Sequence, residues 1–222
     1  MFNGRERKMA RMSSGIRDTL NGNVYNGIIG FVLLWGFIVN VCIVHFCADT
    51  FMAMNPWTLI IGYFISCIIG IVMAVKSNNA FVSFIGYNLV AVPVGAVLSV
   101  ALQEYSSVDI KSAFLATAGI TGVMMIASTA FPKFFAGMGR TLFFSLLLGF
   151  IAEIVCMLFG IVTPIFNWLF VIIFSLYIGY DWYKAQSYPK TVDNAVDSAL
   201  DIYLDIINLF IRLLEIFGKS DD

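Results

Sequence analysis

The sequence predicts an all-α membrane protein, a seven-helix bundle with a central, partly polar seventh helix. Of its 222 residues, 60% are hydrophobic and 12% are charged, whereas a soluble globular domain carries about 25% charged residues. The mean hydropathy is +0.89, and several apolar stretches exceed the roughly 18 residues that indicate a membrane span. We therefore expect a single transmembrane domain over residues 1–222.

Seven stretches are expected to form the helices of the bundle, and short connections between them leave no room for a soluble domain. They are residues 24–46, 57–75, 80–102, 112–131, 141–162, 164–183 and 198–217. Within the third, Pro93 is expected to give a kink that the neighbouring helices accommodate. The seventh either crosses the membrane completely or re-enters it, and the sequence leaves both alternatives open.

The basic residues predict the orientation of the chain. Residues 1–22 form a leader that carries Arg5, Arg7, Lys8, Arg11 and Arg17. Lysine or arginine also follows the second, fourth and sixth spans, and positively charged connections usually remain in the cytoplasm. We therefore expect a cytoplasmic N-terminus and an uncleaved first span, in the plasma membrane of a bacterium or an internal membrane of a eukaryote.

The seventh stretch carries an unusual row of polar side chains. Asp201, Asp205, Asn208, Arg212 and Glu215 lie within its apolar sequence. At 100° per residue they share one helical stripe about 80° wide. Charged groups are costly in hydrocarbon and are usually paired, hydrated or functional, so the stripe is expected to face the interior of the bundle.

Two further aspartates, Asp193 and Asp197, precede this apolar stretch. We expect them to lie in water or among lipid head groups near the start of the helix. The helix dipole favours acidic side chains at that position, so a solvated structural role is predicted for them.

Asp181 lies near the cytoplasmic end of the sixth span, next to Tyr180 and Trp182, aromatic residues typical of the membrane interface. Asp205 lies about 10 Å inside the seventh stretch, which starts from the same side. Because consecutive spans are usually neighbours, the two aspartates are expected to meet. Two carboxylates brought close tend to share one proton, so such a pair would respond to pH.

Asp181 and the stretch ALDIYLDIINLFIRLLEIFG (199–218) resemble the transmembrane Bax-inhibitor-motif family. Its plan of seven spans matches nearly the whole chain, and the most specific match is the core Tyr203–Phe210. The resemblance implies a pH-sensitive calcium leak channel with Asp181 and Asp205 as its proton sensor and weak calcium ligands. It also implies that a basic residue at the cytoplasmic end of the second span engages this pair in the closed state, and the nearest candidate is Lys76.

Other polar residues are candidates for gating or for an ion path. Asp201 and Asn208 share the stripe of Asp205, and two or three carboxylates with water would hold calcium loosely enough for passage. Glu153 is either an outer acid on a cation path or a partner for Arg212, and both readings stay open. For Arg212 and Glu215, a local pair three residues apart is preferred.

Two other functions fit parts of the sequence. An intramembrane aspartyl protease would also use two aspartates on adjacent spans, but the Gly-x-Gly-Asp motif is absent at Asp205 and no Pro-Ala-Leu motif is present. We therefore expect no enzyme activity and no cofactor apart from calcium as the permeant ion. A non-transporting regulator that binds another membrane protein is the second alternative. The expected partners are membrane lipid and calcium, with such a membrane protein left open, and no nucleic acid.

Overall fold

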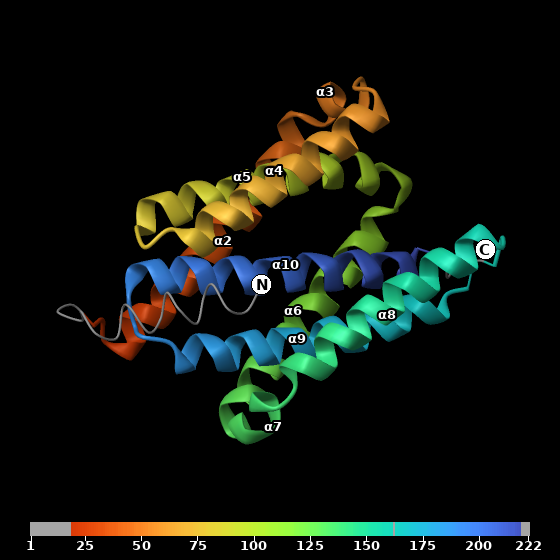
Figure 1. Ribbon diagram of the computed structural model, residues 1–222. Helices are drawn as coiled ribbons and strands as arrows, with labels where there is room; N and C mark the ends of the chain where they lie inside the picture. The colour runs from red at the N-terminus through yellow and green to blue at the C-terminus, as the bar shows by residue number, and fades with distance from the viewer. Residues whose placement is uncertain (1–18, 162, 219–222) are drawn as a thin grey trace. The chain divides into compact units, whose positions relative to one another are not determined.

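The computed structural model describes residues 19–161 and 163–218, which form helices joined by short loops, with no strand in these two ranges (Figure 1). The elements are α2 (Gly22–Phe46), α3 (Ala48–Met52), α4 (Pro56–Lys76), α5 (Ala80–Ala101), the 3₁₀ helix η1 (Leu102–Glu104), α6 (Ser107–Ala130), α7 (Pro132–Ala136), α8 (Gly139–Leu158), α9 (Ile165–Ser187) and α10 (Val192–Phe217). The basic residues of the predicted leader 1–22 all lie within residues 1–18, outside the described residues.

The described helices form two compact units. The first contains residues 19–104 and 187–201, and therefore α2 to η1 with the start of α10. The second contains residues 105–161, 163–186 and 202–218, and therefore α6 to α9 with the remainder of α10. The single domain expected from the sequence stays a prediction.

Among the described residues, six helices are long and apolar enough to cross a membrane, judged by length and composition: α2, α4, α5 with η1, α6, α8 and α9. They coincide with the first six predicted spans, so the chain is a multi-pass integral membrane protein. Large apolar side chains lie exposed on them, among them Phe64, Ile68 and Leu148. Exposed apolar side chains in such number are expected where lipid covers the protein.

Helix α10 differs from these six. It has 26 residues, but it is not among the six apolar helices, because acidic residues recur along it and lower its hydropathy. Every residue from Asp193 to Phe217 is nevertheless buried or partly buried. The predicted seventh helix, enclosed and partly polar, is therefore present.

Capping explains where helices begin earlier than predicted. Helix α6 begins at Ser107 instead of residue 112, because Ser106 and Asp109 form a capping box at its N-terminus. Helix α10 begins at Val192 instead of residue 198, and the Thr191 hydroxyl accepts a hydrogen bond from the Asn194 N–H at 3.2 Å. Such contacts satisfy helical N–H groups, and hydropathy alone does not detect them.

In the first unit, α4 and α5 run side by side (Figure 1). Their closest approach joins Gly70 to Gly86, and a Cβ atom added to either would overlap the backbone carbonyl oxygen of the other. Small residues at a crossing let membrane helices approach closely. This contact fixes α5 against α4 and thereby positions the polar side chains of α5.

Candidate functional site

Asp181 lies near the C-terminal end of α9, and its side chain is 10% exposed. Lys184, one turn further along the same helix, places its Nζ atom 3.0 Å from Asp181 Oδ1. The same ammonium group lies 5.3 Å from the centre of the Tyr180 ring. Lys184 is missing from the predicted site residues, although its i, i+3 spacing from Asp181 is a sequence signal for an ion pair.

The segment of α9 around Asp181 is fixed by contacts with α6 and α7. Ser128 Oγ donates to the Gly179 carbonyl at 2.6 Å, and Trp182 Nε1 donates to Thr129 Oγ1 at 3.1 Å. A Cβ atom on Gly179 would overlap the ring of Phe135. Asp181 therefore sits in a closely packed part of the second unit.

Asp205 lies on the part of α10 that belongs to the second unit, and the residue is 8% exposed. Tyr177, one turn before Asp181 on α9, interacts electrostatically with both Asp205 and Asp181. The two aspartates that the sequence predicts to be neighbours thus approach the same side chain. We call Tyr177, Asp181, Lys184 and Asp205 the Asp181 cluster.

The remaining predicted candidates for gating or an ion path are distributed over both units. Asn208 lies in the second unit, and its Nδ2 atom donates to the Leu204 carbonyl one turn earlier at 2.7 Å. Asp201 is the last residue of the first unit, which also contains Lys76, exposed at the end of α4. The closed-state contact of Lys76, and the places of Asp201 and Asn208 on an ion path, stay predictions.

A second charged cluster surrounds Arg212 on α10. Its Nη1 and Nη2 atoms donate to the two carboxylate oxygens of Glu153 on α8, at 2.6 and 2.8 Å, and Nη1 also donates to Asn167 Oδ1 at 3.0 Å. The guanidinium carbon lies 4.3 Å from the centre of the Phe170 ring. Glu215 Oε2 is 3.6 Å away. We call these five residues the Arg212 cluster.

The Arg212 cluster confirms the pairing of Glu153 with Arg212, and a place for either residue on an ion path stays a prediction. Two parallel hydrogen bonds between a guanidinium and a carboxylate form a strong and directional contact. The expected local pair with Glu215 is also present, but it is longer than the contact with Glu153. On α10, Asp205 of the Asp181 cluster and Arg212 lie about two helical turns apart.

The start of α10 is bound to α2 and α5 within the first unit. Ser83 Oγ on α5 donates to Asp193 Oδ1 at 2.7 Å. The Tyr25 hydroxyl on α2 lies 3.2 Å from Ser198 Oγ and donates to the Asn194 carbonyl at 3.4 Å. These contacts, between residues distant in sequence, explain why the helix is well enclosed from its first turn.

The structure corrects the expectation for Asp193 and Asp197, which are 4% and 2% exposed and so do not lie in water or among head groups. For Asp193, the prediction was wrong because Ser83 on α5 lies over the start of α10 and donates a hydrogen bond to the carboxylate. Nearby, Lys190 Nζ lies 4.6 Å from the centre of the Tyr25 ring. Burial lowers the pKa of Lys190 from its ordinary value of 10.5.

Within residues 19–161 and 163–218, no group of three or more His, Cys, Asp or Glu side chains is arranged to hold a metal ion. His45, between Cys42 and Cys47, packs edge-on against the Phe46 ring, with the ring centres 4.7 Å apart. The weak calcium site expected at Asp181 and Asp205 involves two carboxylates and stays a prediction.

Comparisons with known proteins agree with a membrane protein of several apolar helices. The chain is 28% identical to the inner membrane protein YbhL of Escherichia coli K12 over 158 residues, which cover 65% of this chain and 67% of that protein. It is 26% identical to Bax inhibitor 1 of Schizosaccharomyces pombe over 215 residues, which cover 95% and 80% of the two chains. The model of the family described as "Inhibitor of apoptosis-promoting Bax1" matches residues 17–222. The chain therefore belongs to the Bax inhibitor family of membrane proteins.

Proposed function

We propose that this protein is a pH-sensitive calcium leak channel in which Asp181 and Asp205 form the proton sensor. One observation carries the proposal: two buried carboxylates, from α9 and α10, have the Tyr177 side chain as a common neighbour. Two carboxylates that share a poorly hydrated site disfavour each other's ionisation and tend to titrate together. Buried acidic groups in a membrane protein are also frequent elements of ion and proton pathways.

The mechanism uses the charge of the pair. When both aspartates are ionised, they attract a cation, and Lys184 neutralises part of their charge. A proton bound by the pair cancels one negative charge, which weakens the attraction for calcium and alters the contact between Asp181 and Lys184. One proton therefore affects both the binding of the ion and the packing of α9 against α10.

Calcium is expected to pass without being held firmly. The ion prefers six to eight oxygen ligands, and the pair supplies at most four carboxylate oxygens. Water must provide the remainder, so the ion stays weakly bound and exchanges quickly. Asp201 and Asn208, on the same stripe of α10, are proposed to extend the polar path.

The test is calcium flux through the purified protein in liposomes. Wild-type flux should change between about pH 8 and pH 6, the range in which a shared carboxylate proton can titrate. Asparagine resembles a protonated aspartate in shape and charge. Asp181→Asn and Asp205→Asn should therefore each fix the flux near the level that wild type shows at the acidic end.

Asp49→Asn is the matched control, because Asp49 is exposed on α3 and the charge change is the same. It should keep the wild-type pH response. A response that survives both Asp181→Asn and Asp205→Asn would reject the sensor. Folded protein without flux at any pH would instead favour the alternative, a non-transporting regulator that binds another membrane protein.

A further inference from the structure

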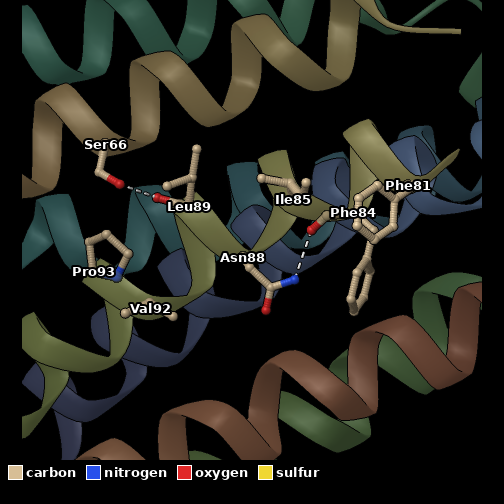
Figure 2. A pocket seen from close by; sticks show the side chains of 8 residues that line it. All are labelled: Ser66, Phe81, Phe84, Ile85, Asn88, Leu89, Val92 and Pro93. Carbon is tan, nitrogen blue, oxygen red and sulfur yellow. Dashed lines mark hydrogen bonds between the residues drawn. The ribbon is translucent and has the colours of Figure 1, made fainter. Parts of the chain in front are cut away.

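A groove lies on the surface of the first unit, between α4 and α5. It has a volume of about 480 Å³ and is lined by Ser66 of α4 and by residues of α5 (Figure 2). The α5 residues are Phe81, Phe84, Ile85, Asn88, Leu89, Val92 and Pro93. This volume lies within the usual range of small-molecule sites, about 300–1,000 Å³.

Pro93 explains why a backbone carbonyl of α5 accepts its hydrogen bond from a side chain of α4. Proline has no backbone N–H, so the carbonyl of Leu89, four residues earlier, loses its helical donor. Ser66 Oγ of α4 donates to this carbonyl at 2.6 Å (Figure 2). The expected accommodation of Pro93 by a neighbouring helix is therefore a specific hydrogen bond.

The amide of Asn88 is likewise engaged inside the protein. Its Nδ2 atom donates to the Phe84 carbonyl at 2.7 Å (Figure 2), and its Oδ1 atom accepts from Trp35 Nε1 of α2 at 3.0 Å. Both polar side chains of the groove thus already bind protein groups. An apolar occupant can enter without depriving either of its partner.

The position of the groove determines what surrounds it. Ser66 lies midway along α4 (Pro56–Lys76), about 15 Å of helical rise from either end. Both α4 and α5 are long and apolar enough to cross a membrane. At this depth the surrounding medium is the hydrocarbon of the bilayer, roughly 30 Å thick.

The lining distinguishes a lipid chain from another helix. Helix–helix contacts in membranes favour small residues, which let the backbones approach, whereas Phe81, Ile85 and Val92 present exposed large side chains. A helix is also about 10 Å wide with its side chains, so it would cover this groove without entering it. No lining residue is charged, which suits the uncharged part of an amphiphile.

We propose that this groove binds an alkyl chain of a membrane lipid. The chain lies along α5 between Phe81 and Pro93 and contacts α4 at Ser66. The proposal is independent of calcium flux and of the Asp181 cluster. It assigns to the first unit a specific lipid site, distinct from the general lipid-covered surface.

The probe is phosphatidylcholine with a photoreactive diazirine in the middle of one acyl chain, mixed into vesicles that contain the full protein. After irradiation, mass spectrometry locates the labelled residues. Labelling of residues 81–93 should exceed that of the exposed Val123 and Ile126 on α6 roughly tenfold, which corresponds to about 1.4 kcal/mol of preference.

Val92→Phe fills the groove without removing a hydrogen bond, and it should reduce labelling of residues 81–93 to the level of α6. Val123→Phe, the same change on exposed α6, should leave the labelling of the groove as in wild type. Equal labelling of the groove and of α6 in wild type would overturn the proposal. Groove residues that are labelled less than Val123 and Ile126 would overturn it as well, because something other than lipid would then cover the groove. If Val92→Phe fails to fold, the ratio of labelling between residues 81–93 and α6 in the wild-type protein still tests the proposal.

Discussion

The Asp181 cluster and the Arg212 cluster hold charged side chains in two different ways. Lys184 approaches Asp181 from the same helix, three residues along. Arg212 instead reaches from α10 to Glu153 on α8 and Asn167 on α9, and it lies over the Phe170 ring. The planar guanidinium can make two parallel bonds with one carboxylate, which an ammonium group cannot.

This difference separates a cluster that joins two helices by a bidentate ion pair from one that, in the proposed mechanism, binds a proton. Glu153 and Arg212 connect two helices, so losing the charge of one partner alone should loosen the packing of α8 against α10. The Asp181 cluster contains two aspartates that share Tyr177 as a neighbour, and a proton can replace part of the charge without removing a bond between helices α8 and α10. A polar contact between two helices and one within a single helix are therefore expected to have different roles in this protein.

The largest effect is expected from Arg212→Met. This change leaves Glu153 without its bidentate partner, and breaking a buried pair typically costs 3–5 kcal/mol. Because the Glu153 side chain is 29% exposed, we expect the lower cost of about 2–3 kcal/mol. Thermal or denaturant unfolding in detergent micelles measures it.

The double variant Arg212→Met with Glu153→Met should regain most of this loss, because replacing both charges by apolar groups is often neutral. A double variant less stable than Arg212→Met alone would show that the pair does not hold α8 and α10 together. The contrast between the two clusters in stabilising helix packing would then be lost.

A smaller effect is expected from adding a methyl group beside each cluster. Gly179, two residues before Asp181, has no room for a Cβ atom because the Phe135 ring occupies the space, whereas a Cβ atom on Gly149 would lie 3.2 Å from Phe170. Gly179→Ala should therefore destabilise the protein by about 1–2 kcal/mol through overpacking. Gly149→Ala should cost less, because its Cβ atom meets the Phe170 ring at a distance that a small shift of the ring can relieve; both variants gain equally from the higher helix propensity of alanine.

Unfolding of the two variants under identical conditions measures this difference. Equal stability of Gly179→Ala and Gly149→Ala would mean that Phe135 moves aside easily. Asp181 would then sit in a looser surrounding than its neighbours indicate.

The sequence predicts the six apolar helices and the polar stripe of α10 well, because apolar length and helical spacing are local properties. It cannot choose between the two readings of Glu153, since short loops do not determine which helices meet. It fails for Asp193, whose donor Ser83 lies on a helix 110 residues away in sequence. Lys184 could have been found from its spacing to Asp181, but a basic residue near the cytoplasmic interface is first interpreted as an orientation signal.

The smallest effect on stability is expected from Lys184→Met. This variant also tests most directly how the Asp181 cluster differs from the Arg212 cluster. Asp181 can bind a proton once its cationic neighbour is gone, so the loss should stay below about 1 kcal/mol, in the range of weak ion pairs. Function should change more. Without the positive charge, a proton binds the aspartate pair at a lower proton concentration, and the pH response of calcium flux should move by about one unit toward higher pH.

Lys184→Arg is the matched variant, because it keeps the positive charge and should leave the response near that of wild type. Calcium flux in liposomes from about pH 8 to pH 6 compares the three proteins in the range where the pair should titrate. If Lys184→Met keeps the wild-type response while Asp181→Asn abolishes it, Lys184 does not act on the sensor. The two clusters would then differ in geometry alone, because neither ion pair would influence the pH response of calcium flux.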